Sequence, residues 1–254
     1  MFSFYPPGQL NMSRNIFRRF FPLDTRCHNV APREAWLEAK LAALPSGIRI
    51  LDAGAGELAQ KKYCTHLQYV AQDFGQYTGE GDSRGLQTGK WDQSKLDIVS
   101  DIASIPEPDA SFDAVLCVEV FEHLPNPFLA LQEFSRLLKP GGKLILTAPF
   151  CAFTHFSPYF FHTGFSLYWY KLHLPEFGFE ILEITPNGNF STYLMQEVGR
   201  IPAIAKQYTN ITPTRFERIG LRLVKSLLSR MIATDSTSQE FTCFGYHVLA
   251  QKRG

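Results

Sequence analysis

Residues 50–57, ILDAGAGE, and a later acid have the types and the spacing of a nucleoside-binding site. Gly54 and Gly56 follow a short apolar run, and glycine lets the backbone turn tightly and lets a ligand approach main-chain atoms that a Cβ would shield. Asp73 stands 19 positions after Gly54, at the end of a second apolar run. A carboxylate in that place can accept hydrogen bonds from both hydroxyls of an adenosine ribose.

Asp52 distinguishes between two kinds of nucleoside ligand. A dinucleotide site would use the same glycines and acid, and its G-x-G-x-x-A variant accommodates Ala59. An acid two positions before the first glycine would crowd a pyrophosphate, but it could help to hold the ammonium group of an amino-acid ligand. The pattern therefore favours a nucleoside with a positively charged amino-acid tail.

Four of the seven histidines fall between residues 123 and 173, and two of them follow expected strands. His123 and His155 would lie at the carboxyl ends of strands, where open α/β sheets bind ligands. Each could act as a catalytic base or contact an acceptor, and each could equally be a hydrogen-bonded part of a pocket wall. We expect His162 and His173 to be structural.

Apolar runs that alternate with helical patterns must position these side chains. Strands are expected at residues 48–51, 67–71, 96–99, 112–120, 143–148, 179–185 and 241–252, and helices at 32–45, 127–138, 166–177 and 213–233. A further helix is expected to start after Gly56. The alternation over residues 32–186 predicts an α/β fold with a doubly wound, mostly parallel sheet. The glycine-rich segment 75–95 predicts a surface excursion of the kind that often covers a ligand.

Residues 186 and 241 are separated by far more chain than neighbouring strands need, which predicts a helical insertion at about residues 187–240. Its helix at 213–233 has an apolar side and a basic side. The apolar side holds Phe216, Gly220, Leu223, Leu227 and Met231, and the other holds Arg218, Arg222, Lys225 and Ser229. We expect a packed helix with a solvated basic face, and the alternatives are a membrane surface, a lid or a subunit contact.

Composition restricts the class of protein further. Lys plus Arg at 25 against Asp plus Glu at 24 leaves a formal charge of +1, so no global field attracts nucleic acid. An N-terminal arm is expected at residues 1–31, where arginines interrupt the apolar residues that an export signal needs. No apolar run is long enough to span a membrane.

The side-chain inventory also argues for a reduced, metal-free protein. The five cysteines, Cys27, Cys64, Cys117, Cys151 and Cys243, have no CxxC spacing, which predicts reduced thiols and a cytoplasmic location. Neither HxH nor HExxH occurs, so we expect no metal site.

Four segments, in order and at plausible spacing, resemble the class I S-adenosylmethionine-dependent methyltransferases. The segments are LDAGAGE at 51–57, Asp73, LDIVSDI at 96–102, and the stretch 112–150 that contains FDAVLCVEVFEHLPNP and FSRLLKPGGKLILTAPF. The last stretch is similar to that of the small-molecule branch, methyltransferase type 11, which includes ubiquinone methyltransferases. The resemblance covers roughly residues 32–186 and the last strand. It implies a seven-stranded Rossmann-like sheet whose last strand runs antiparallel beside the sixth.

The resemblance implies S-adenosylmethionine as the cofactor and assigns its contacts. Cofactor contacts would come from Asp52, Gly54 and Gly56 at the methionyl part, Asp73 at the ribose, Asp101 and Ile102 at the adenine, and Glu119. Asp101 offers an acceptor for the adenine amine and Ile102 an apolar wall. For Asp101 the alternative role is a helix N-cap or turn, and for Asp73 a turn at the end of a strand.

The implied reaction is in-line methyl transfer from a sulfonium to a small-molecule acceptor, with His155 and His123 as catalytic candidates. The acceptor would be a hydroxyl, amine or carbon of a sugar, polyketide, quinone or lipid-linked compound. Nucleic acid is not expected as a partner, and the oligomeric state stays open. One alternative is an NAD(P)-dependent oxidoreductase, although a convincing Tyr-x-x-x-Lys pair is lacking. Another is a non-catalytic module that binds S-adenosylmethionine.

Overall fold

The computed structural model describes residues 29–82, 84–87 and 89–254. They fall into two compact units, one formed by residues 29–189 with 239–254 and the other containing residues 190–238. We call the first the sheet domain and the second the helical hairpin. The N-terminal arm expected at residues 1–31 lies outside the described residues except for its last three positions, and Cys27 lies outside them too.

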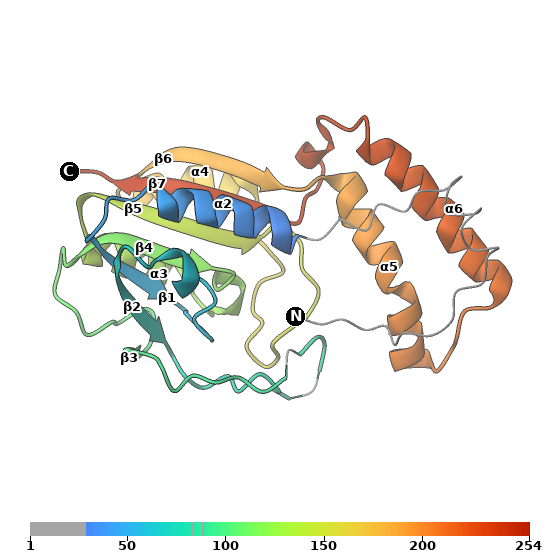
Figure 1. Cartoon of the computed structure of the whole chain (residues 1–254), viewed down its shortest axis with the longest axis horizontal. Coiled ribbons are helices and arrows are strands. Elements are labelled where there is room, and N and C mark those ends of the chain that lie inside the picture. Colours follow the sequence, from blue (N-terminus) through green and yellow to red (C-terminus); the bar gives the residue numbers. More distant parts are fainter. Residues whose placement is uncertain (1–28, 83, 88) are drawn as a thin grey trace. The chain divides into compact units, whose positions relative to one another are not determined.

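A seven-stranded sheet forms the centre of the sheet domain (Figure 1). The strands are β1 (Arg49–Ala53), β2 (Gln68–Asp73), β3 (Ile98–Val99), β4 (Phe112–Val118), β5 (Leu138–Pro149), β6 (Phe179–Asn187) and β7 (Gly245–Lys252). Their order is β3-β2-β1-β4-β5-β7-β6. The first five run parallel, and β7 pairs antiparallel with both β5 and β6. The prediction of a seven-stranded, mostly parallel sheet with an antiparallel last strand is confirmed.

Helices cover both faces of the sheet and start where the sequence supplies a cap. Helix α2 (Val30–Ala42) packs Leu37 and Leu41 against one face, and α3 (Pro127–Leu137) and α4 (Leu167–Glu176) pack against the other. The side chains of Asn126 and Ser166 accept backbone N–H groups at the starts of α3 and α4. The buried apolar residues form two clusters, one on each face of the sheet.

The expectation of a helix directly after Gly56 was wrong. The chain makes a series of turns and then one short 3-10 helix, η1 (Lys61–Tyr63). Leu58 has a φ of 61°, and a left-handed residue cannot continue a right-handed helix. Strand β3 is shorter than predicted, β5 begins earlier and β7 begins later.

The helical hairpin consists of α5 (Phe190–Thr209) and α6 (Arg215–Ile232), which pack against each other. Thr214 and Glu217 form a reciprocal capping box at the start of α6. The carboxylate of Asp235 accepts a hydrogen bond of 2.8 Å from the hydroxyl of Ser191 and so joins the two ends of the hairpin. The helix predicted at 213–233 is present, whereas α5 was expected only as part of an unspecified helical insertion. Among the described helices, none is long and apolar enough to cross a membrane.

Helix α2 is tied to β6 by one carboxylate. Glu183 accepts hydrogen bonds from Lys40 at 2.5 Å and from the Trp36 indole at 2.8 Å. These contacts lower the pKa of Glu183 to about 2. Because its folded-state pKa lies below the unfolded value, its contribution to stability is complete above about pH 4.3 and declines as the pH falls toward 2.

We therefore expect Glu183→Gln to reduce the free energy of unfolding at pH 7 by about 0.5–1 kcal/mol, because the pair is partly exposed to solvent. Urea unfolding at pH 7 and at pH 3 measures the difference from the wild type, which should narrow at the lower pH. Glu180→Gln, an exposed position on the same strand, is the control. A difference that is the same at both pH values would contradict the assigned role.

Candidate active site

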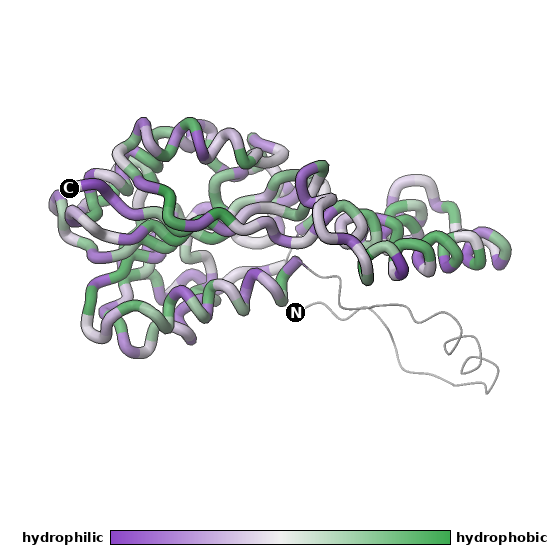
Figure 2. Tube along the Cα trace, turned by 90° about the horizontal axis from the view of Figure 1, so that it is seen from above, coloured by the Kyte–Doolittle hydropathy of each residue, from purple (hydrophilic) through white to green (hydrophobic). Residues whose placement is uncertain are grey.

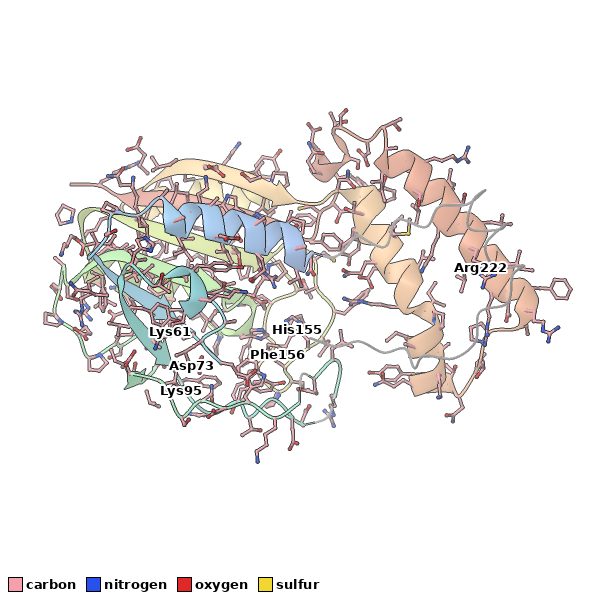
Figure 3. The ribbon with its side chains drawn as sticks, viewed as in Figure 1. Lys61, Asp73, Lys95, His155, Phe156 and Arg222 are labelled. Carbon is pink, nitrogen blue, oxygen red and sulfur yellow. The ribbon has the colours of Figure 1, made fainter. Side chains whose placement is uncertain are left out.

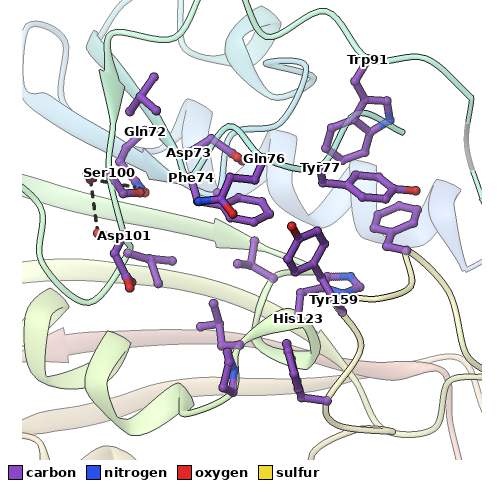
Figure 4. Close-up of a pocket in the computed structure, with 18 residues that line it drawn as sticks. Gln72, Asp73, Phe74, Gln76, Tyr77, Trp91, Ser100, Asp101, His123 and Tyr159 are labelled. Carbon is purple, nitrogen blue, oxygen red and sulfur yellow. Dashed lines mark hydrogen bonds between the residues drawn. The ribbon is translucent and has the colours of Figure 1, made fainter. Parts of the chain in front are cut away.

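A cavity of about 570 Å³ opens at the carboxyl ends of β1, β2, β3 and β4 (Figure 4). Its size is typical of sites for ligands the size of a cofactor. The cavity is lined by Gly54, Gln72, Asp73, Phe74, Gln76, Tyr77, Trp91, Val99, Ser100, Asp101, Ile102, Val120, His123, Leu124, Pro125, Phe156, Tyr159 and Phe161. The structure thus brings together five residues that the sequence analysis proposed for the site: Gly54, Asp73, Asp101, Ile102 and His123.

The glycine turn at residues 54–56 is required by its surroundings. Gly54 has a φ of 81°, and a Cβ there would lie 2.5 Å from a methyl group of Val120. Gly56 has a φ of 51°, and a Cβ there would lie 3.1 Å from the ring of Trp91. Both N–H groups point toward β2: that of Gly54 donates to the carbonyl of Gln72 at 2.9 Å, and that of Gly56 to the carboxylate of Asp73 at 3.0 Å.

Asp73 accepts three hydrogen bonds from the chain as well as lining the cavity. Its Oδ2 accepts the Gly56 N–H, and its Oδ1 accepts the Gly75 N–H at 2.9 Å and the side-chain amide of Gln93 at 3.2 Å. The bond to Gly75 is the turn that the sequence analysis gave as the alternative role. A ribose hydroxyl that donates to Oδ1 would take the place of the Gln93 amide.

The groups expected at the adenine also lie at the cavity. Asp101 is exposed, and its Oδ1 accepts the N–H of Ala103 at 2.8 Å, which is the turn named as its alternative role. Its second oxygen has no such bond among the described residues. Ile102 is buried beside it. Gln72 donates to Ser100, while its own amide oxygen is buried without a partner among the described residues. The second carboxylate oxygen of Asp101 and the amide oxygen of Gln72 could therefore accept hydrogen bonds from an adenosine.

Asp52 and Glu119 do not line the cavity. Asp52 accepts a short hydrogen bond from the hydroxyl of Tyr69 on the neighbouring strand. Burial raises the pKa of Asp52 to about 7, the bond from Tyr69 opposes this rise, and the charge of Asp73 adds to it. Glu119, with a φ of 54°, binds Arg33 at 2.8 Å and Thr147 at 2.9 Å. A direct cofactor contact for either acid stays a prediction.

Two loops form an aromatic wall that the sequence analysis only partly anticipated. The glycine-rich excursion is paired by backbone hydrogen bonds with residues 154–157, through Leu86 to Thr154 at 3.1 Å and Phe156 to Leu86 at 3.0 Å. Tyr77 is buried and stacks on Phe156 with ring centroids 4.9 Å apart. Trp91 meets Tyr77 edge to face at 4.9 Å. The excursion therefore contributes buried side chains to the site and is not merely a surface loop.

Two histidines share one buried carboxylate beside the cavity. Glu122 is 1% exposed, and its Oε1 lies 3.6 Å from Nε2 of His123 and 3.6 Å from Nε2 of His155. Nδ1 of His123 donates to the Tyr159 carbonyl at 2.5 Å, and Nδ1 of His155 donates to the Phe153 carbonyl at 2.8 Å. Because carbonyls only accept, each Nδ1 carries a hydrogen and both Nε2 atoms face the carboxylate.

The common carboxylate and burial affect the two rings differently. Burial lowers the pKa of His123 below its ordinary value, against the charge of Glu122, and the neighbouring His155 lowers it further. Burial also acts to lower the pKa of His155, but the carboxylate of Glu122 and the Phe153 carbonyl outweigh it, so that pKa is raised. A pair of groups with pKa values displaced in opposite directions is suited to acid–base work.

His123 and His155 differ in their access to the cavity. His123 lines it and stacks on Phe156 with centroids 5.1 Å apart, whereas His155 is not among the lining residues. Figure 3 places His155 next to Phe156 in the loop behind the wall. Glu122 was missed as a site residue, although its position directly before His123 was a usable signal. Its Oε2 is buried without a partner among the described residues.

The three groups could also hold a cation. Ligand atoms of Glu122, His123 and His155 all lie within 4.8 Å of one another, and each Nδ1 donates to a carbonyl as metal-binding histidines usually do. The sequence analysis expected no metal because it considered only spacing within one segment, and His155 comes from a different loop. That expectation stays a prediction.

Comparison with known proteins agrees with this geometry. Residues 51–146 match the family model described as a methyltransferase domain. A ubiquinone biosynthesis O-methyltransferase of Xanthomonas oryzae pv. oryzae (strain PXO99A) is 35% identical over 105 residues, which cover 40% of this chain and 43% of that protein. That of Xanthomonas campestris pv. campestris (strain B100) is 32% identical over 123 residues, 47% of this chain and 50% of the relative. The matches therefore span half or less of these relatives.

Solved structures share the fold over most of the chain. A SAM-dependent methyltransferase from Archaeoglobus fulgidus has a TM-score of 0.53 at 16% identity and covers 94% of this chain and 99% of its own. The [4+2]-cyclase SpnF has a TM-score of 0.54 at 19% identity, with coverages of 87% and 80%. Such likeness shows the fold alone. Together with the family model matched by residues 51–146 and the sequence relatives, this fold supports a class I S-adenosylmethionine-dependent methyltransferase domain in the chain.

Proposed function

We propose that this protein transfers a methyl group from S-adenosylmethionine to a small-molecule acceptor. The observation that carries the proposal is the set of polar groups at one end of the cavity. Asp73, Asp101 and Ile102 line the cavity, and we propose Asp73 as the acceptor for the ribose hydroxyls, Asp101 as the acceptor for the adenine amine and Ile102 as its apolar wall. Gly54 leaves the strand end open to the rest of the nucleoside.

The turn after Gly56 argues against a dinucleotide cofactor. Dinucleotide sites hold the pyrophosphate at the N-terminus of the helix that follows the glycines. Here the described chain after Gly56 makes turns and a single short 3-10 helix, with Leu58 in the left-handed region. The site lacks the aligned N–H groups that two phosphates require, whereas a methionyl tail does not need them.

The sulfonium of the bound cofactor supplies an activated methyl group, so the chain must chiefly align the acceptor and receive a proton. An acceptor hydroxyl must lose its proton as the new bond forms. His123 borders the cavity, and burial favours its neutral form. We propose His123 as the base, in which case its ring would have to turn toward the acceptor, because Nδ1 is bonded to the Tyr159 carbonyl and Nε2 is buried beside Glu122. His155 would help to fix its orientation through the edge contact of the two rings, and Glu122 would stabilise its charge once it is protonated.

The aromatic wall supports a flat, apolar acceptor. Tyr77, Trp91, Phe156 and Tyr159 offer ring faces and edges at one side of the cavity, and such walls stack planar molecules. The relatives from Xanthomonas are named O-methyltransferases of ubiquinone biosynthesis. We therefore propose a hydroxyl on a ring-containing molecule as the acceptor class.

The remaining partners are proposals as well. We propose a cytoplasmic location with no nucleic acid partner, and we propose the helix expected at 213–233 as a contact surface for a membrane or for another subunit.

Calorimetric titration with S-adenosylhomocysteine, and separately with NAD, tests the cofactor class. We expect micromolar binding of S-adenosylhomocysteine and none of NAD. Binding of NAD alone would favour the oxidoreductase alternative. Binding of S-adenosylhomocysteine without methyl transfer to any of a series of phenols and catechols would favour a non-catalytic module.

Substitution of Asp73 tests the ribose contact. We expect Asp73→Asn to weaken S-adenosylhomocysteine binding about 10- to 100-fold, because hydrogen bonds to a charged acceptor contribute about 1.5–3 kcal/mol. Asp73→Ala should also lower the free energy of unfolding by about 1–3 kcal/mol, because it removes the acceptor of the Gly56 and Gly75 N–H groups. Calorimetry and urea unfolding measure the two effects.

Gln93→Ala is the matched control for Asp73, because it removes a donor from the same carboxylate and leaves the acceptor in place. Its affinity for S-adenosylhomocysteine should equal or exceed that of the wild type. Wild-type affinity in Asp73→Asn would remove Asp73 from the ribose site.

Glu122→Gln tests the coupling of the two histidines. Glu122 raises the pKa of both rings, so its neutralisation should lower both. NMR titration of the imidazole resonances between pH 4 and 9 measures the two values, with His155 titrating above His123 in the wild type. Glu180→Gln, on β6, should change neither.

Unchanged histidine pKa values in Glu122→Gln would disprove the coupling. The same resonances test the expectation that no metal binds: addition of Mg²⁺ or Zn²⁺ should leave those of His123 and His155 in place. A joint shift of both rings would instead assign the three groups to a metal site.

A further inference from the structure

The helical hairpin exposes an unusual amount of apolar surface. Nine of the nineteen large hydrophobic residues that are exposed in the described chain lie within the short stretch 201–227. They are Ile201, Ile204, Tyr208, Ile211, Phe216, Ile219, Leu223, Val224 and Leu227. Scattered exposed apolar residues are common in proteins, but a concentration of this kind marks an interaction surface.

Helix α6 has two apolar faces, and only one of them packs. One face contains Leu228, which is buried, and Leu221, which lies seven positions earlier and is half-buried. Phe216, Leu223 and Leu227 lie on a different face, where Phe216 is 86% and Leu223 is 53% exposed. The apolar side that the sequence analysis expected to pack is thus the side that solvent reaches. Figure 2 shows apolar residues along much of this hairpin.

The arginines of α6 lie on a different side of the helix, about 80° or more around it from Phe216, Leu223 and Leu227. Arg215, Arg218 and Arg222 are exposed, and Figure 3 shows Arg222 on α6. Lys225, which the sequence analysis placed on this face, is half-buried: its ammonium group would lie 3.3 Å from a Cβ at Gly199, and burial lowers its pKa. The exposed cations on this side of α6 are therefore the three arginines, of which Arg218 also donates to the Pro213 carbonyl at 3.0 Å.

The charge of the hairpin differs in sign from that of the sheet domain. Residues 190–238 hold seven basic and three acidic side chains, a formal charge of +4. The sheet domain, residues 29–189 with 239–254, holds fourteen basic and twenty acidic side chains, a formal charge of −6. The whole chain is nearly neutral, but the hairpin carries a positive charge. Electrostatic complementarity therefore favours a partner with an anionic surface.

We infer that the helical hairpin binds the surface of an anionic lipid bilayer. Residues 1–28 are a poor match for this face, because their four arginines and one aspartate give them a formal charge of the same sign. A bilayer interface accepts apolar side chains into its acyl boundary and attracts arginine to its headgroups. The exposed surface of α6 has both elements, with Phe216 and Leu223 on one side and Arg218 and Arg222 on another.

The hairpin would lie in the interface and not cross it. No described helix is long and apolar enough to span a bilayer. An amphipathic helix that uses apolar contact and charge together binds reversibly and depends on ionic strength. The inference narrows the contact surface proposed for residues 213–233 to one partner, and it is independent of the proposed methyl transfer because membrane binding requires neither the cofactor nor an acceptor.

Flotation of the full-length protein with vesicles tests the inference. We expect binding to vesicles of phosphatidylcholine mixed with phosphatidylglycerol, much weaker binding to phosphatidylcholine alone, and release by high salt. Arg218→Glu combined with Arg222→Glu should weaken binding at least about 30-fold, as should Phe216→Ser combined with Leu223→Ser. Circular dichroism and S-adenosylhomocysteine binding should stay unchanged in both variants.

The sheet domain supplies matched controls for both pairs. Tyr168 and Leu172 on α4 are exposed to a similar degree, 78% and 59%, so Tyr168→Ser combined with Leu172→Ser should bind vesicles like the wild type. Lys171→Glu combined with Arg253→Glu makes the same change in charge and should also bind normally. Equal loss in the control and hairpin variants, or no binding by the wild type, would overturn the inference. It would also fail if the hairpin substitutions altered the oligomeric state in light scattering and left vesicle binding unchanged.

Discussion

The carboxylate of Asp73 holds the site together through main-chain N–H groups. One oxygen fixes the glycine turn by way of Gly56, and the other starts the excursion by way of Gly75. Because the excursion in turn pairs with the loop at residues 154–157, the position of the aromatic wall depends on this anchor. A buried acceptor with two amide donors is costly to remove. The residue that would recognise a ribose is therefore also the residue that builds the recess around it.

Much of the fold could be predicted, and so could the floor of the cavity, which is formed by the strand-end residues Gly54, Asp73 and Asp101. Both depend on local sequence patterns. Short apolar runs that end in Gly54, Asp73 and Asp101 place those residues at one edge of a parallel sheet. Their order along the chain is enough to bring them together without any knowledge of side-chain packing. The antiparallel position of β7 depended on the family resemblance, since its sequence alone contains no signal for direction.

The features that could not be predicted depend on contacts between segments that are distant in the sequence. The bond from Tyr69 to Asp52 crosses neighbouring strands, so the motif that contains Asp52 gives no indication of it. The bridge between Leu86 and His155 joins two loops without regular structure. Leu58 breaks a helix by its backbone conformation, which composition does not reveal. In α6 a second apolar face decides which side packs, and an amphipathic pattern by itself cannot choose between the two.

The wall and the floor of the cavity have separate structural origins. The floor follows the strand ends, whereas Tyr77, Trp91 and Phe156 come from two loops joined mainly to each other. Substitutions in these loops can change the shape of the recess while the sheet, Asp73 and Asp101 stay as they are. Evolution could therefore change the acceptor through substitutions in the two loops while the strand-end residues proposed for the cofactor stay the same.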